Sequence, residues 1–213
     1  MNKRPPASRQ RENHDPADAE APKGKRLVRA FYRQPAPELA PRLLGKWLCR
    51  RSGRRTLRLR ITETEAYYGE ADTACHARRG RTPRTDIMYA AGGHAYIYLC
   101  YGMHEMLNVV SGAADFPEAV LIRGVEGADG PGKLTRALGI TRGLNREDLT
   151  VSKRLWIEDD GTAVAFTTAP RIGIAYASAR DRRRRWRFAV APCAQADAVI
   201  HRKEHKERRE GDP

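Results

Sequence analysis

The sequence lacks the features of membrane-bound, secreted and zinc-binding proteins. It has no run of about 18 apolar residues, and its first 25 residues are polar with no apolar core, so we expect neither a membrane span nor a secretory signal. The 4 cysteines are widely spaced and include no C-x-x-C pair, which is typical of reduced thiols and predicts no zinc framework. We therefore expect a cytosolic protein that uses no metal and no other cofactor.

Acidic residues are also in deficit, with 26 Asp and Glu against 40 Lys and Arg, which gives a net charge of +14. Residues 1–25 hold six basic and four acidic side chains, and residues 201–213 hold five and four, so residues 26–200 keep a net charge of +11. Such an excess in the body of a protein favours binding to polyanions, of which nucleic acid is the commonest. A charge that serves only solubility is the alternative.

The chain length and the hydrophobic content predict one folded domain. With 213 residues, 40% of them hydrophobic, a single core can form. Residues 1–25 have no periodicity and predict a disordered basic N-terminal tail, and the alternating charges of residues 201–213 predict a disordered charged C-terminal tail. The folded domain is therefore expected over residues 26–200.

The pattern of that domain is mainly β, without the βαβ alternation of a parallel sheet. We predict a hairpin of residues 46–50 and 55–67 around Ser52-Gly53, a second hairpin of residues 95–101 and 106–110 with Gly102-Met103-His104 at its tip, strands at 119–122, 163–167, 171–175 and 186–190, and short helices at 38–44 and 133–138. The expected fold class is α+β, a single domain with a curved, mainly antiparallel β-sheet core flanked by helices and a protruding β-hairpin.

Residues 55–67 carry two acids on one face of the predicted strand. In an extended chain Leu57, Leu59, Ile61, Glu63, Glu65 and Tyr67 share a face, and Thr56, Arg58, Arg60, Thr62 and Thr64 share the other, which we expect to face water. Burying a carboxylate is costly unless it has a partner, so these acids serve either chemistry or an ion pair. For Glu63 we favour an ion pair with a buried arginine.

A long loop and a tyrosine-rich strand follow these acids. Residues 69–91 hold few apolar side chains and include His76, and residues 96–101 contain three tyrosines. In a basic protein, flat rings beside a buried carboxylate indicate a pocket that stacks a nucleobase and activates a water. Ordinary strand packing of the tyrosines and a hydrogen-bonded loop histidine remain the alternatives.

Two short motifs resemble other kinds of site. Residues 127–134 nearly match a phosphate-binding loop, but Leu134 stands where a hydroxyl must ligate magnesium, so we expect no nucleotide triphosphatase. Gly132 and the first amides of the following helix could still hold a DNA phosphate, with a plain turn as the alternative. His201, Glu204 and His205 spell a zinc-protease pattern in a tail with no apolar support, and we expect no such site.

Ordered motifs over most of residues 40–190 resemble the alkyladenine (3-methyladenine) DNA glycosylases of the vertebrate type, which are distinct from the helix-hairpin-helix glycosylases. The matching positions are Leu43-Leu44-Gly45-Lys46, Glu63-Thr64-Glu65-Ala66-Tyr67, Gly69, Asp72, His76, Thr82-Pro83-Arg84, Met88, Gly93, Tyr96-Ile97-Tyr98, Tyr101-Gly102-Met103, Asn108, Ala119-Val120-Leu121-Ile122-Arg123, Gly130-Pro131-Gly132-Lys133-Leu134, Arg171-Ile172-Gly173 and Arg187-Phe188.

The resemblance implies a role for each matching site residue. Glu65 is implied as the general base that polarises the attacking water, which Arg123 and the backbone near His76 help to hold. Tyr67 and His76 are implied to stack on one face of the flipped base and Tyr98 on the other, while Asn108 is implied to exclude guanine. Tyr101, with Met103 and His104, is implied to insert into the DNA minor groove. The residues implied to contact the DNA backbone are Thr82, Arg84, Gly132 and Lys133.

Chemistry agrees with the implied activity. A purine alkylated at a ring nitrogen is cationic, so an aromatic sandwich favours it by about 0.5–2 kcal/mol. A carboxylate near the sugar can stabilise an oxocarbenium-like transition state and direct water to C1′. No lysine lies in the pocket motifs to act as an amine nucleophile, so we predict a monofunctional base-excision-repair glycosylase without lyase activity, acting as a monomer on double-stranded DNA at the nucleoid.

Two departures from the family pattern leave an alternative open. Only residues 124–129 separate Arg123 from Gly130, where relatives usually carry a longer helical insert. The alternative is therefore a nucleic-acid-binding module with weakened catalysis. The second departure is a cluster of six arginines, which we interpret as further phosphate contacts or as a solvated loop: Arg180, Arg182, Arg183, Arg184, Arg185 and Arg187.

Overall fold

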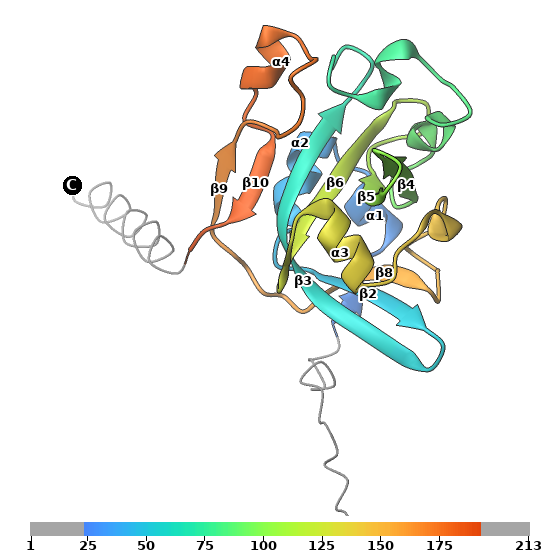
Figure 1. Ribbon diagram of the computed structural model, residues 1–213. Helices are drawn as coiled ribbons and strands as arrows, with labels where there is room; N and C mark the ends of the chain where they lie inside the picture. Colours follow the sequence, from blue (N-terminus) through green and yellow to red (C-terminus); the bar gives the residue numbers. More distant parts are fainter. Residues whose placement is uncertain (1–23, 193–213) are drawn as a thin grey trace, which may run out of the picture.

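The computed structural model describes residues 24–192 (Figure 1). The C-terminal tail predicted over residues 201–213 lies outside this range, and so do His201, Glu204 and His205 of the zinc-protease pattern. Most of the predicted N-terminal tail also lies outside it, although Lys25 begins the first strand. Among residues 24–192, no helix is long and apolar enough to cross a lipid bilayer.

Runs of strands are separated by short helices along the described chain. The strands are β1 (Lys25–Arg26), β2 (Trp47–Ser52), β3 (Arg55–Tyr68), β4 (Ala95–Cys100), β5 (His104–Val110), β6 (Glu118–Val125), β7 (Ala128–Asp129), β8 (Leu155–Asp159), β9 (Phe166–Ala169) and β10 (Arg187–Val190). The helices are α1 (Arg29–Tyr32), α2 (Ala36–Arg42), α3 (Pro131–Ala137) and α4 (Ala179–Arg183), with 3₁₀ turns η2 (His76–Arg79), η3 (Asp86–Tyr89) and η4 (Arg142–Leu144).

The strands form one antiparallel sheet that is organised around β3. The order is β1-β8-β2-β3-β6-β5-β4, and β10 also pairs with β3 while β9 pairs with β10. The 14 residues of β3 reach two sets of partners, because its first half pairs with β2 and its second half pairs with β6 and β10. This architecture confirms the predicted α+β class.

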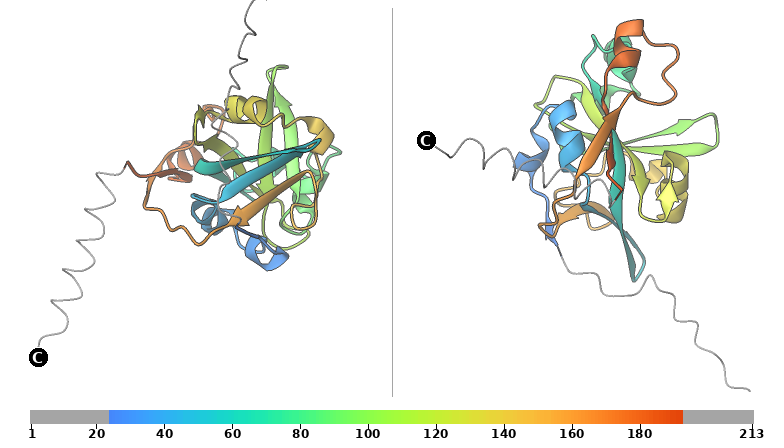
Figure 2. Two further views of the ribbon diagram at one scale, coloured as in Figure 1. Left: turned by 90° about the horizontal axis from the view of Figure 1, so that it is seen from below. Right: turned by 90° about the vertical axis from the view of Figure 1, so that its left-hand side faces the viewer.

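Helices cover both faces of β3, with α2 on one side and α3 on the other (Figure 2, right). The prediction that Thr64 faces water is therefore wrong. Thr64 is fully buried, and its hydroxyl donates to the carbonyl of Ala40 in α2 at 2.9 Å. The pairing of β3 with β6 shifts register on both sides of Glu63, which interrupts the expected alternation, and a helix covers the second face at this end, so both faces belong to the core.

The tyrosine-rich hairpin of β4 and β5 projects from the body of the molecule (Figure 2, right). At its tip Tyr101 has φ +50° and Gly102 has φ +70°, so two successive residues take left-handed backbone conformations. Glycine accepts this conformation without strain, and Tyr101 is held in it by the turn. The side chain of Tyr101 is 86% exposed.

Two predicted strands differ from the structure, and one long strand was not predicted. Residues 155–159 form β8, which was not predicted because its first four residues are all buried and show no alternation. The strand predicted at 163–167 begins three residues later, at Phe166. The strand predicted at 171–175 is wrong, because this segment is a loop in which Gly173 has φ +76° and Arg171 points inward to pair with Asp72.

Candidate active site

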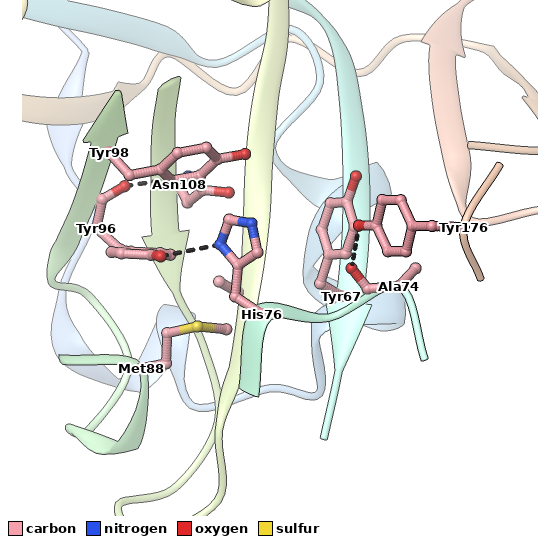
Figure 3. Close-up of a pocket in the computed structure, with 9 residues that line it drawn as sticks. Tyr67, Ala74, His76, Met88, Tyr96, Tyr98, Asn108 and Tyr176 are labelled. Atoms are coloured by element: carbon pink, nitrogen blue, oxygen red, sulfur yellow. Dashed lines mark hydrogen bonds between the residues drawn. The ribbon is translucent and has the colours of Figure 1, made fainter. Parts of the chain in front are cut away.

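A tyrosine-walled pocket opens between β3, η2 and the β4–β5 hairpin. His76 lies with Tyr96 and Tyr98 on one side, and Tyr67 lies with Tyr176 on the other (Figure 3). The inner space is about 40 Å³, and a cavity of about 480 Å³ that shares four of these side chains adjoins it.

Glu65 lies beside this pocket with no exposed surface. Its Oε1 accepts a hydrogen bond of 2.8 Å from the Ile172 amide, and its Oε2 accepts one of 2.8 Å from the Tyr67 hydroxyl. Burial raises the pKa of Glu65 above its usual value, although the Ile172 amide and the nearby Arg123 both favour the ionised form. A carboxylate held in this way has the fixed geometry and the raised basicity of a general base.

Glu63 and two arginines flank Glu65. Glu63 Oε1 lies 2.8 Å from Arg187 Nη1 and 3.3 Å from Arg123 Nε, and the same Nε lies 3.6 Å from Glu65 Oε1. The predicted ion pair of Glu63 with arginine is therefore confirmed. Arg123 Nε is buried and makes no hydrogen bond within residues 24–192, so its N–H has free donor capacity close to Glu65.

The resemblance implied that His76 stacks beside Tyr67, with Tyr98 on the other face of the base, but in the structure His76 lies against Tyr98, across the pocket from Tyr67 (Figure 3). The ring centroids of His76 and Tyr98 are 4.6 Å apart in an edge-to-face arrangement, and His76 Nδ1 lies 2.9 Å from the Tyr96 hydroxyl. Burial and the positive charges of Arg84 and Arg78 lower the pKa of His76 to about 4. His76 is therefore neutral at physiological pH and presents an uncharged ring to the pocket.

Asn108 is fixed on the pocket floor. Its side-chain nitrogen donates to the carbonyls of Tyr96 at 3.1 Å and Met106 at 3.3 Å, and the residue is 4% exposed. These bonds hold the amide in one orientation. A side chain that is to exclude a base by contact needs this rigidity.

Comparison with known proteins identifies the family. A sequence model described as methylpurine-DNA glycosylase matches residues 30–194. The chain belongs to this family. A Psychrobacter cryohalolentis protein named "Putative 3-methyladenine DNA glycosylase" is 44% identical over 178 residues, covering 70% of this chain and 84% of the relative. Proteins of the same name from Methanocella arvoryzae and Myxococcus xanthus are 43% and 45% identical, covering 81% and 71% of this chain and 96% and 83% of the relatives.

The residues predicted to contact DNA lie in different places around the methylpurine-DNA glycosylase pocket. Tyr101 and Met103, at the hairpin tip, are 86% and 69% exposed. His104 does not join them, because a Cβ added at Gly132 would meet its imidazole at 2.9 Å, so His104 packs against the start of α3. Of the remaining four, Gly132 in α3 is partly exposed and the others are exposed: Thr82 and Arg84 in the loop after η2, and Lys133 in α3.

The loop of residues 170–178 forms one wall of the pocket. No role in the site was predicted for this loop. It supplies the Ile172 amide to Glu65 and places Tyr176 in the pocket wall, where the Tyr176 hydroxyl donates to the Ala74 carbonyl at 2.9 Å. Arg171 anchors the loop through a buried pair with Asp72, with bonds of 2.5 and 2.8 Å. Gly173, which interrupts the predicted strand, is the sequence signal for this loop.

Within residues 24–192 no three His, Cys, Asp or Glu side chains come together in a way that could hold a metal ion. The arginine cluster near the C-terminus is partly structural. Asp181 of α4 is fully buried, accepts bonds from the Thr73 amide and hydroxyl, and lies 3.3 Å from both Arg180 and Arg184. The alternative of a solvated loop is thus wrong for residues 179–183, which form a short helix that is hydrogen-bonded to Thr73, while the phosphate contacts stay a prediction.

Proposed function

We propose that this protein, a DNA glycosylase of base-excision repair, releases alkylated or deaminated purines from duplex DNA by hydrolysis of the N-glycosidic bond. The observation that carries the proposal is Glu65, which is fully buried beside an aromatic pocket and held by the Ile172 amide and the Tyr67 hydroxyl. Burying a carboxylate costs free energy even when it is hydrogen-bonded, so its placement beside an aromatic pocket supports a catalytic role.

In the proposed reaction, Glu65 accepts a proton from water while the water oxygen bonds to C1′ of the flipped nucleotide. The bond from C1′ to the purine nitrogen breaks, and its electron pair leaves with the base. The negative charge of Glu65 also stabilises the cationic sugar of the transition state. Arg123 Nε, buried without a hydrogen bond among the described residues, supports a role in holding the water.

We infer that Tyr67, His76 and Tyr98 stack on the extruded base and that Asn108 excludes the guanine amine. Tyr101 and Met103 would fill the gap left in the duplex, which their exposure at the hairpin tip supports. Among residues 24–192, no lysine lines the inner pocket or the cavity that adjoins it, which supports a monofunctional enzyme without lyase activity.

Several finer assignments belong to the same proposal. We place the chain with the vertebrate type within its family, because the motifs quoted above are of that type. We expect a glycosylase domain over residues 26–200 that acts as a monomer, since searching along DNA needs no second subunit. Because the substrate is DNA, we expect the protein to work in the cytoplasm at the nucleoid.

The decisive experiment replaces Glu65 by glutamine. Glutamine keeps the size of the side chain but cannot take the proton, so we expect Glu65→Gln to bind damaged duplex normally and to release hypoxanthine or 3-methyladenine on the order of 100-fold to 10,000-fold more slowly. Single-turnover release and equilibrium DNA binding measure the two effects separately.

The matched control is Glu63→Gln, which changes a carboxylate that pairs with Arg123 and Arg187 at the edge of the site. A smaller loss is expected there. Wild-type rates in Glu65→Gln would remove Glu65 from its role. If the wild-type protein bound DNA but released no base, the alternative of a binding module would hold.

A further inference from the structure

Three tyrosines of the pocket each carry an arginine against the ring. The guanidinium carbon of Arg84 lies 5.0 Å from the ring centre of Tyr98, and that of Arg78 lies 4.8 Å from the ring centre of Tyr176. Arg171 stands 4.8 Å from the ring centre of Tyr67. These distances lie within the range of cation–π contact, so the rings that would clamp a base already interact with protein cations.

The three arginines differ in how their charge is balanced. Arg171 is neutralised by its buried two-bond pair with Asp72. Arg84 and Arg78 form no ion pair with any carboxylate among residues 24–192. Their charges are therefore uncompensated by the protein at the entrance to the pocket.

The other charges of the site balance one another. Glu63 and Glu65 face Arg123 and Arg187 across distances of 2.8 to 3.6 Å, and these four groups sum to zero when both acids are ionised. His76 contributes no charge at physiological pH. The excess charge next to the stacked base is thus positive, and it comes from Arg84 and Arg78.

We propose that Arg84 is a specificity-determining residue that disfavours cationic purines and favours neutral ones. This inference rests on the proposed function. Arg84 lies over the ring of Tyr98, with its guanidinium carbon 5.0 Å from the ring centre, and it lines the outer cavity together with Tyr67 and His76. A base stacked on Tyr98 would therefore lie close to its charge. Coulomb repulsion opposes a purine that carries a methyl cation but acts only weakly on hypoxanthine, which is neutral.

The test compares release of hypoxanthine with release of 3-methyladenine from matched duplexes under single-turnover conditions. Arg84→Met removes the charge and keeps a long side chain on the Tyr98 ring. We expect the ratio of 3-methyladenine release to hypoxanthine release to rise about threefold to tenfold in this variant. Arg84→Lys keeps the charge, so its ratio should stay close to that of the wild-type protein.

Arg79→Met is the matched control, because Arg79 is exposed in the same 3₁₀ turn as Arg78 and makes no ring contact or ion pair within the described residues. If Arg84 only contacts a DNA phosphate, Arg84→Met slows both reactions equally, and the unchanged ratio overturns the inference. An equal shift of the ratio in Arg79→Met overturns it too. Release of neither base by the wild-type protein would instead refute the proposed function on which the inference rests.

Discussion

At the scale of single residues, Glu65 experiences opposing effects. Burial raises its pKa, while the Ile172 amide, Arg123 and the Tyr67 hydroxyl lower it, and burial is the larger effect. Tyr67 therefore contributes to the site in two ways: its ring lines the pocket, and its hydroxyl donates a hydrogen bond to the Glu65 carboxylate. The same carboxylate is basic enough to take a proton and rigid enough to direct a water.

The raised pKa predicts the pH dependence of base release. Glu65 acts as a base only when ionised, so the rate should fall about tenfold per pH unit below its pKa, and this acidic limb should lie above the ordinary value of 4.5. Tyr67→Phe removes a hydrogen bond that favours the ionised form, so it should move the limb further upward. Single-turnover rates between about pH 4 and pH 8 measure both effects. A limb at the ordinary position would contradict the assignment.

At the scale of elements, α2 is joined to the sheet through Glu118. The residue before α2 is Pro35, which offers no capping side chain, and Glu118 at the start of β6 accepts the amide of Ala36 instead. Its second partner is the Ser111 hydroxyl at 3.2 Å, and the residue is 3% exposed. Burial raises the pKa of Glu118 to about 7. Gly112 is required here because a Cβ would overlap the carboxylate.

This carboxylate predicts a pH-dependent stability. The pKa of Glu118 is higher in the folded than in the unfolded protein, so its contribution is full below about pH 4.5 and is lost as the pH rises through about 7. Glu118→Gln removes the titration. The free energy of unfolding of the wild type should therefore fall relative to the variant by about 1 to 3 kcal/mol between about pH 5 and pH 8. Urea unfolding at several pH values measures this, and parallel curves for the two proteins would contradict it.

At the scale of the whole molecule, charge and shape act together. Residues 26–200 carry a net charge of +11. The hairpin of β4 and β5 projects from the body (Figure 2), and Tyr101 at its tip lines the cavity that adjoins the pocket. Part of the positive charge is neutralised by ion pairs within the protein, such as those of Arg171 with Asp72 and Arg60 with Asp160. The exposed remainder is available to DNA phosphates.

This charge predicts a steep salt dependence of DNA binding. If about six to ten phosphates are contacted, affinity for undamaged duplex should fall about 10³-fold to 10⁵-fold between about 50 and 200 mM salt. The rate of base release from saturated complexes should change little, because Glu65 is shielded from solvent. Binding titrations and single-turnover assays across the salt series separate the two. An affinity that is independent of salt would show that the surface charge serves solubility alone.

The sequence by itself determined the two hairpins and the face that carries the acids. Alternation in residues 55–67 placed Glu63 and Glu65 correctly, and the tyrosine-rich hairpin was visible because strand residues flank a glycine turn. These features depend on neighbours along the chain, which a local pattern records. The ion pair of Glu63 with arginine was expected on other grounds, because an acid on the inner face of a strand needs a partner.

Only the tertiary structure decided what covers each face and what closes the pocket. Thr64 is buried because α2 crosses behind β3, and Ile172 reaches Glu65 because Arg171 pairs with Asp72, 99 positions earlier in the chain. β8 was not predicted because a strand that is buried on both faces shows no alternation of apolar and polar residues. Contacts between distant segments depend on packing, which leaves no periodic signal in the sequence.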